Sequence, residues 1–407
     1  MVIRCTSSHP LRVANDIPLG EEYTSYSSIG IRENRIKFRI KGREKVSKKT
    51  EKSLVLVGTR KGAFIFTSKD GRRTWKVTGP LFRGKEIYHM AYDRRNKILF
   101  ASVEDPQWGP SVARSFDLGK TWKLANSPKF SKNDREESVK RVWHIEPSIE
   151  DEPDVVYCGV EPATLFRSDD RGENWTVNTA MFDHPTRSKW QPGFGGLCLH
   201  TILIRPDDPK DIHVGISAVG TLNSKDRGET WKFQNKNVLA DFSPDKYPEY
   251  GQCVHKMARH PDRPDVIYQQ NHCGVYRSDD NGEDWKDIRN NLPSRFGFPI
   301  AVDANDPKRA YVVPLEGDFS RVSPEGNFYV WTTDNSGKQW APVHKGLPHP
   351  VYFTILRDAM TSDAEDPCGI YVGTTTGHLY ASRNAGSLWT TLSDTLPPIL
   401  SISASTA

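Results

Sequence analysis

The chain has 407 residues, of which 36% are hydrophobic, 10% aromatic and 26% charged, with 28 Pro, 30 Gly and 11 Trp. It contains no run of about eighteen apolar residues, which argues against a membrane-spanning helix, and its many turn formers favour short strands over long helices. A formal net charge of +5 is a weak indication of a nucleic-acid partner, and the place of the excess charge in the chain argues against one.

The N-terminal segment, residues 1–52, carries the whole charge excess. It holds 12 Lys or Arg against 6 Asp or Glu, whereas the rest of the chain holds 44 against 45. Asp16, Glu21 and Glu22 interrupt its start and no apolar core follows, so we expect no secretory signal. We therefore expect a basic flexible tail, no nucleic-acid or membrane partner, and a cytoplasmic protein. The six Cys form no C-x-x-C pair and fit a reducing compartment.

An octet of the form S-x-D-x-G-x-x-W recurs from residue 68 onward. Asp or Asn in such an octet caps the N–H groups of a turn, Gly adopts positive φ, and Trp packs between neighbouring sheets. A period of about fifty residues with one turn motif per unit predicts propeller blades. The seven copies are 68–75 (SKDGRRTW, with Asp70 and Gly71 in a shifted form), 115–122 (SFDLGKTW), 168–175 (SDDRGENW), 224–231 (SKDRGETW), 278–285 (SDDNGEDW), 333–340 (TDNSGKQW) and 382–389 (SRNAGSLW).

Each unit reads as four strands with the octet between the third and the fourth. The first octet is preceded by only two strands, at 54–59 (LVLVGT) and 63–68 (AFIFTS), while a further strand at 399–405 (ILSISAS) follows the last octet. This last strand can supply the missing innermost strand of the first blade. The sequence thus predicts an all-β fold in which residues 53–407 form a single seven-bladed propeller whose ring is closed by the C-terminal strand.

The octets resemble the Asp-box, or BNR, repeats of sialidases, of sortilin-type propellers and of bacterial proteins labelled glycosyl hydrolase. The resemblance covers residues 53–407 and implies the fold, but it is nearly silent on activity because the octet is a folding device. Sialidases are six-bladed, use an arginine triad and begin with F-R-I-P. Here residues 38–41 read F-R-I-K and lie in the tail.

Alternate turns of a blade lie on opposite faces of the ring. We call the face with the octets the bottom face. The top face carries the entries to the innermost strands and the turns between second and third strands. Sites in propellers usually form on the top face near the axis, so the positions that map there are the candidates.

Histidines recur at one predicted position of the innermost strands. Most first turns of a blade end in Pro, and counting back nine residues from Pro153, Pro209 and Pro264 gives a His each time. The second unit, with a shorter turn, contributes another. One offset in a closed ring predicts one height, so we expect these imidazoles to converge on the axis and hold a divalent transition metal, Fe, Zn, Mn or Cu. The predicted ligands are His89, His144, His200 and His255.

The turns between second and third strands place further polar residues around this histidine cluster. Glu104, Glu161 and Glu316 are the predicted catalytic carboxylates, acting as general base or orienting the imidazoles. Arg60 and His272 are predicted substrate contacts on the same rim.

Longer loops that enter the His-bearing blades could form a lid. The predicted substrate contacts in them and in the nearby turn at 104–110 are Trp108, His184, Arg187, Gln191 and Tyr250. Cys198 and Cys253 lie two residues before His200 and His255, as soft ligands or as small channel-filling residues.

Three functions fit these patterns. The first is a metal-dependent hydrolase, lyase or oxygenase acting on a small or sugar-like substrate, comparable in architecture to carotenoid-cleaving oxygenases, which also place four His on a seven-bladed propeller. The second is a sialidase-like glycoside hydrolase that uses two of Glu104, Glu161, Glu316 and Asp183. The third is a non-catalytic binding or assembly propeller. We favour the first; the sequence leaves the substrate and the oligomeric state open.

Overall fold

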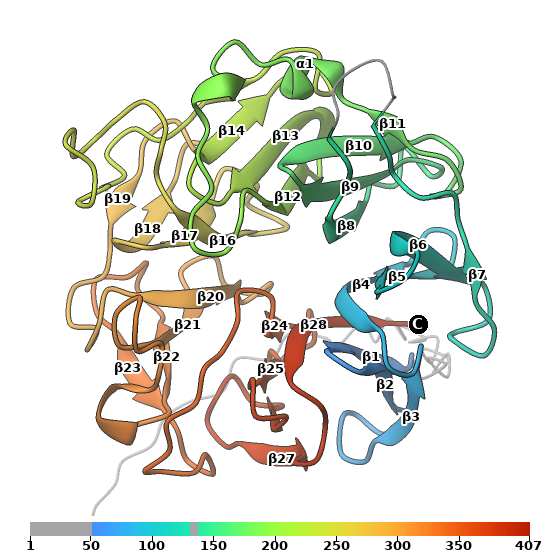
Figure 1. Cartoon of the computed structure of the whole chain (residues 1–407). Helices are drawn as coiled ribbons and strands as arrows, with labels where there is room; N and C mark the ends of the chain where they lie inside the picture. The colour runs from blue at the N-terminus through green and yellow to red at the C-terminus, as the bar shows by residue number, and fades with distance from the viewer. Residues whose placement is uncertain (1–50, 131–136) are drawn as a thin grey trace, which may run out of the picture. The chain divides into compact units, whose positions relative to one another are not determined.

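The computed structural model describes residues 51–130 and 137–407. Within these ranges twenty-eight strands form seven four-stranded antiparallel sheets, arranged as the blades of a ring (Figure 1). Each innermost strand contacts the innermost strands of its two neighbours, so the ring is closed. The chain is an all-β, seven-bladed propeller, as predicted. The predicted tail at 1–52 lies outside the described residues except for its last two positions.

The strands of each blade follow one another from the axis outward. Blade 1 takes its innermost strand from the C-terminus and comprises β28 (Ile399–Thr406), β1 (Ser53–Thr59), β2 (Gly62–Ser68) and β3 (Lys76–Leu81). Blade 2 comprises β4 (Glu86–Asp93), β5 (Ile98–Asp105), β6 (Gly109–Ser115) and β7 (Lys123–Leu124). Blade 3 comprises β8 (Arg141–Pro147), β9 (Val156–Glu161), β10 (Thr164–Ser168) and β11 (Thr176–Val177). Blade 4 comprises β12 (Leu199–Arg205), β13 (Asp208–Ile216), β14 (Gly220–Ser224) and β15 (Lys232–Phe233).

The remaining three blades repeat this order. Blade 5 comprises β16 (Val254–Arg259), β17 (Ile267–Asn271), β18 (Gly274–Ser278) and β19 (Lys286–Asp287). Blade 6 comprises β20 (Gly297–Val302), β21 (Ala310–Pro314), β22 (Val330–Thr333) and β23 (Ala341–Val343). Blade 7 comprises β24 (Met360–Ser362), β25 (Ile370–Gly373), β26 (Leu379–Ser382) and β27 (Thr390–Ser393). The described helical segments are one turn each: α1 (Thr179–Phe182) and two 3₁₀ turns at Arg187–Lys189 and Pro324–Gly326.

The octets form the predicted turns on the bottom face. In blade 3 the Ser168 hydroxyl donates to Asp170 and accepts from the Gly172 N–H, while Asp170 accepts from the Asn174 N–H at 2.9 Å. In blades 4 to 7 the octet Trp then fastens one blade to the one before it. The Trp285 indole N–H, for example, donates to the Gln234 carbonyl at 2.9 Å. The octets therefore account for both the turns and part of the contact between blades.

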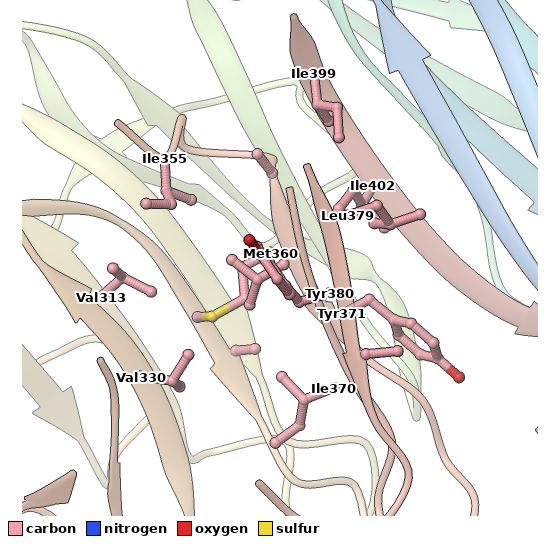
Figure 2. Close-up of a cluster of buried hydrophobic side chains, with 14 of the residues drawn as sticks. Val313, Val330, Ile355, Met360, Ile370, Tyr371, Leu379, Tyr380, Ile399 and Ile402 are labelled. Carbon is pink, nitrogen blue, oxygen red and sulfur yellow. The ribbon is translucent and has the colours of Figure 1, made fainter. Parts of the chain in front are cut away.

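Apolar side chains fill the spaces between blades. The largest cluster spans blades 1, 6 and 7 and includes Val313, Ile355, Met360, Tyr371 and Ile402 (Figure 2). β1 is buried along its whole length because it pairs with β28 on one side and β2 on the other. Its β-branched and leucine side chains suit such a central strand.

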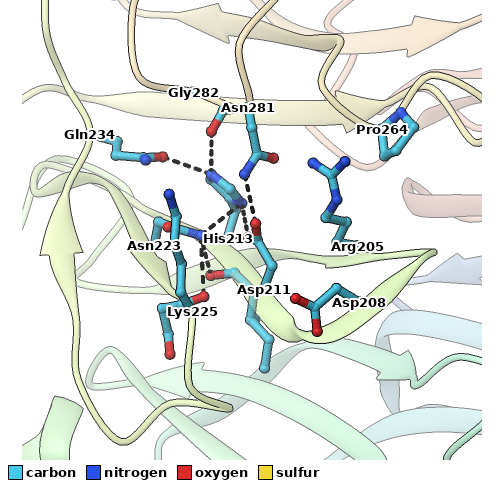
Figure 3. A network of polar contacts seen from close by, with 12 residues as sticks. Arg205, Asp208, Asp211, His213, Asn223, Lys225, Gln234, Pro264, Asn281 and Gly282 are labelled. Atoms are coloured by element: carbon cyan, nitrogen blue, oxygen red, sulfur yellow. Dashed lines mark hydrogen bonds and ion pairs between the residues drawn. The ribbon is translucent and has the colours of Figure 1, made fainter.

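One buried polar network also belongs to the scaffold. His213 on β13 is fully buried, its Nε2 donating to the Gln234 side chain and the Asn281 carbonyl, and its Nδ1 accepting from Arg259 at 2.8 Å. Asp211 accepts from Asn223 and Asn281 beside it (Figure 3). Both ring nitrogens of His213 are hydrogen-bonded, so this residue links blades 4 and 5 as part of the scaffold.

Candidate functional site

The innermost strands run from the top face to the bottom face, and each of the four strands that carry or border these His has a bulge in its first half. There the pairing with the second strand shifts by one residue or more. Bulges re-aim side chains, and they alter the predicted register. His89 and His144 occupy equivalent places, each one residue before the pairs Met90–Ala101 and Ile145–Cys158.

His200 and His255 do not share that place. By pairing register the equivalent residues of blades 4 and 5 are Thr201 and Lys256. The physical reason is turn length: the first turn of blade 3 is one residue longer than those of blades 4 and 5, so counting back from Pro overshoots by one. The expectation that the four imidazoles converge at one height is therefore wrong.

His200 serves as a bridge between blades. Its Nδ1 bonds to the Thr201 hydroxyl at 3.1 Å and its Nε2 to the Val254 carbonyl at 3.0 Å. Both ring nitrogens are thus engaged by the protein, and no lone pair is left for a metal. The structure does not support His200 as a ligand.

His255 lies instead with Cys253 and His272 at the top-face end of the axis. One ligand atom from each of the three lies within 4.8 Å of the others. The His255 Nδ1 donates to the Gly297 carbonyl at 2.6 Å. A carbonyl only accepts, so the proton is on Nδ1 and the lone pair is on Nε2. A backbone carbonyl fixing one nitrogen is the usual support of a ligating imidazole.

The neighbours of His272 complete this cluster. Its Nε2 lies 3.9 Å from an Asp318 carboxylate oxygen, and its ring meets Phe242 and Phe296 edge to face. Burial lowers the pKa of both imidazoles, that of His255 well below its ordinary value with Arg357 as the next cause. Both rings are therefore neutral near pH 7, the form that binds metals.

His89 and His144 form a second cluster with Asp358, deeper along the axis. The imidazoles lie with ring centroids 4.1 Å apart, and one ligand atom from each of the three residues lies within 4.8 Å of the others. However, the His89 Nδ1 accepts from the Ile145 N–H at 3.3 Å, which leaves the proton on Nε2. Lys256 also forms an ion pair with Asp358. A metal would have to displace that ammonium, so this cluster suits a cation less well than the first.

A cavity of about 360 Å³ opens beside the second cluster. It follows the later halves of the innermost strands, so it extends toward the bottom face. Glu146 lines it, 3.2 Å from the His144 Nε2, and burial raises the pKa of Glu146 to about 7. Among the described residues the His144 Nδ1, although buried, has no hydrogen-bond partner.

The predicted rim carboxylates lie on the top face, but two of them are bound to arginine. Glu104 accepts from Arg141 at 2.7 and 3.4 Å, and Glu161 accepts from the Trp143 indole at 3.1 Å with Arg141 3.8 Å away. Arg141 also stacks on Tyr88, 4.1 Å from the ring centroid. Arg60 pairs with Glu86 at 3.2 Å. The Glu316 N–H closes its loop by donating to the Val322 carbonyl.

Three of the predicted loop contacts pack into the scaffold. Arg187 is buried, and its guanidinium donates to the Ala163 carbonyl, so its proposed exposure to substrate is wrong. The ring of His184 lies 5.3 Å from that of Phe233, and Tyr250 stacks on Phe233 at 5.0 Å. The other two, Gln191 and Trp108, are exposed.

The sequence predicts the members of the cluster of Cys253, His255 and His272, but not that they lie together. His272 was predicted as a rim contact and Cys253 as a soft ligand or channel filler, and neither was joined to His255. Two features of the sequence indicate this cluster. Cys253 and His255 are two residues apart at the start of β16, and His272 directly follows β17, the strand that pairs with β16.

No protein-family model matches the chain, and no curated protein matches it. Solved structures do resemble it. The periplasmic gluconolactonase PpgL from Pseudomonas aeruginosa is 13% identical, with a TM-score of 0.54 over 88% of this chain and 99% of that one. YCF48 from Cyanidioschyzon merolae is 13% identical, with a TM-score of 0.50 over 77% and 87%.

An ancestral GH74 enzyme is also 13% identical with a TM-score of 0.50, over 78% of this chain. The present chain spans only 38% of the length of that enzyme. At these identities the likeness concerns the fold alone. Among the described helices, none has the length and apolar character needed to cross a membrane.

Proposed function

We propose that the protein is a metal-dependent enzyme whose ion is held by Cys253, His255 and His272 at the top-face end of the axis. One observation carries the proposal. The Gly297 carbonyl fixes the proton of His255 on Nδ1, so Nε2 carries the lone pair. A ring nitrogen of His255 also lies within 4.8 Å of the Cys253 sulfur and of a ring nitrogen of His272. Three potential ligands from one blade, close together and partly exposed, match the protein share of a catalytic metal site.

The donor set favours zinc among the predicted metals. A thiolate with two imidazoles suits Zn²⁺, whereas Mn²⁺ prefers oxygen ligands. Asp318, 3.9 Å from the His272 Nε2, would orient that ring once it ligates. A zinc ion with three protein ligands has one position left for water, so hydrolysis is the reaction class we assign. A reducing compartment is part of the proposal because Cys253 ligates only as a free thiolate.

The octets support a place among Asp-box propellers, since the blade 3 octet forms the hydrogen-bonded turn that the motif requires. Such membership would account for the propeller scaffold, and the residues near the axis would determine the reaction. For the alternative, a glycoside hydrolase, two of the predicted carboxylates share the Arg141 guanidinium. We therefore rank it second.

Metal analysis tests the proposal. Protein purified without added metal should contain about one zinc ion per chain, and Cys253→Ala and His272→Ala should each lose it. Cys198→Ala is the matched control, because Cys198 has the same position relative to His200 but lies outside the cluster. It should keep its metal.

A cobalt-substituted sample adds a second readout. Thiolate ligation gives cobalt(II) a charge-transfer absorption, which should disappear in Cys253→Ser and persist in Cys198→Ala. Equal metal content in the wild type and in both cluster variants would refute the site. Loss of metal in His144→Ala instead would move the ion to the deeper cluster.

A further inference from the structure

Two arginines at the top-face end of the axis have no carboxylate partner among the described residues. We propose that Arg321 and Arg357 form an oxyanion-recognition site that takes the carboxylate or phosphate group of a small organic ligand. The inference names the substrate class of the metal site and so rests on the proposed function in that respect. The arginine geometry that carries it is independent of any metal.

Arg357 precedes β24 and points toward blades 3 and 4. Its Nη1 donates to the Cys198 sulfur at 3.2 Å, and its guanidinium carbon lies 5.2 Å from the Trp143 ring centroid. A thiol and an indole face hold the guanidinium in place without neutralising its charge. Its remaining N–H groups are therefore available to an anion.

Arg321 lies in the loop between β21 and β22. Its Nε donates to the Asp318 backbone carbonyl at 2.7 Å, and its guanidinium carbon lies 5.5 Å from the Phe298 ring centroid. Its φ of 52° lies in the left-handed region, which is uncommon for residues other than Gly.

The two arginine segments are joined to each other. The Thr354 hydroxyl, three residues before Arg357, donates to the Arg321 carbonyl at 2.7 Å. The Phe298 ring beside the Arg321 guanidinium also lies 4.7 Å from the His255 ring, centroid to centroid. Arg321 is therefore one ring away from the imidazole of the proposed metal ligand, and the bond from Thr354 links its loop to the segment of Arg357.

No carboxylate of the described residues forms an ion pair with either guanidinium. Asp241 is bound by Arg295 and accepts from the Cys273 thiol. Asp318 faces His272. By contrast, Arg141 on the same face is occupied by Glu104. Each guanidinium offers a planar fork of N–H donors, the geometry that binds carboxylates and phosphates in pairs of hydrogen bonds.

Two aromatic side chains flank the arginines. Phe194 and Phe319 are 83% and 87% exposed, yet their ring centroids lie only 6.2 Å apart. Phe319 is two residues before Arg321, and Phe194 adjoins Gly195, where a Cβ would lie 3.4 Å from the Arg357 Nη2. Loops of blades 4 and 6 therefore meet beside the two guanidinium groups. Exposed aromatic faces next to arginines favour an organic anion with an apolar or planar body over a bare inorganic ion.

The test uses benzoate, phenyl phosphate, inorganic phosphate and neutral benzamide as probes in isothermal titration calorimetry. We expect an aromatic anion to bind better than inorganic phosphate or benzamide, and added salt to weaken it. Preference for benzoate or for phenyl phosphate identifies the group recognised. Arg321→Gln and Arg357→Gln should each weaken binding by about tenfold, because each removes charged hydrogen bonds. Arg83→Gln, which alters an exposed arginine in the loop that enters β4 on the same face, should leave it unchanged.

Two further arms separate this inference from the metal proposal. Binding that persists in Cys253→Ala supports the arginine site whatever the metal content, and binding lost there but kept in both Gln variants assigns the anion to a metal and overturns the inference. Should a Gln variant fail to fold, Arg321→Lys and Arg357→Lys keep the charge and should still lose affinity, because lysine lacks the planar fork. Equal affinity for benzoate and benzamide, or unchanged affinity in all the Arg321 and Arg357 variants, would also overturn the inference.

Discussion

Glu146 shows how a single residue couples the axial cavity to stability. Its pKa, raised by burial to about 7, exceeds the ordinary glutamate value, with His89, Lys256 and Arg95 partly opposing the shift and His144 in contact. The native state therefore favours the neutral acid, and stability should fall as pH rises from the ordinary glutamate range through 7.

Replacing Glu146 with Gln should remove this pH dependence. Because the side chain is 37% exposed toward the cavity, we discount the effect for water screening and expect a gain of about 2 kcal/mol in the free energy of unfolding at a pH of about 8. At a pH of about 4.5 the variant and the wild type should be equal. Urea unfolding across this range checks the result, with Glu150→Gln, on an exposed turn, as the control. A constant difference at all pH values would contradict the assignment.

For single residues, the sequence predicts which side chains belong to the candidate site better than where they lie in the fold. His255, His272 and Cys253 were all named, but their meeting depends on a bulge in β16 and on a first turn one residue shorter than that of blade 3. Neither feature has a sequence signal of its own, because Pro153 and Pro264 look alike in the pattern. A difference of one residue in turn length decides whether an imidazole lies beside another His, as His144 does, or bonds to the next blade, as His200 does.

The octet of blade 1 departs from the others, and its departure strengthens the ring. Arg72 takes the position that Gly holds elsewhere, with a φ of 63°. Its guanidinium donates to both oxygens of Asp363 in blade 7, each at 3.0 Å, and to the Pro367 carbonyl. Both side chains of the pair are buried. The shifted Asp-Gly order seen in the sequence thus marks an element that fastens blade 1 to blade 7.

Replacing Arg72 with Ala should lower the free energy of unfolding by about 3 kcal/mol, because the Asp363 carboxylate would stay buried without its cation. Arg73→Ala, an exposed neighbour in the same turn, should change it by no more than about 0.5 kcal/mol. Denaturant unfolding of both variants checks the difference. If Asp363→Asn restores stability in the Arg72→Ala background, the buried charge is the cause; if it makes stability worse, packing of the arginine stem is the cause instead.

For the whole molecule, the repeat length and the seven octets were sufficient to predict the ring. An octet fixes a turn, a turn fixes two antiparallel strands, and a period of about fifty residues leaves only blades as the repeating unit. The missing strand of the first blade then had one source, the segment that forms β28. The proposed site was less predictable because scaffold residues repeat in every blade, whereas Arg321 and Arg357 occur in non-repeating loops.

The closure by β28 gives the last prediction. β1 pairs with β28 from Ser53 to Thr59, and β28 also contacts β4 and β24 of the neighbouring blades. Removing residues 399–407 would expose one edge of β1 and the apolar surface beneath Ile399 and Ile402, which the largest core cluster buries. We expect this truncation to abolish cooperative unfolding and to expose apolar surface, as measured by calorimetry and dye binding.

Removing residues 1–50 is the matched truncation at the other end. All four strands of blade 1 lie within the described residues from Ser53 onward, so this variant should unfold cooperatively with an unchanged midpoint. Because the ring is one closed circuit of blades, loss of one inner strand should affect all seven blades, not blade 1 alone. A C-terminal truncation that still melts in one sharp transition at the wild-type temperature would show that the blades hold together without closure.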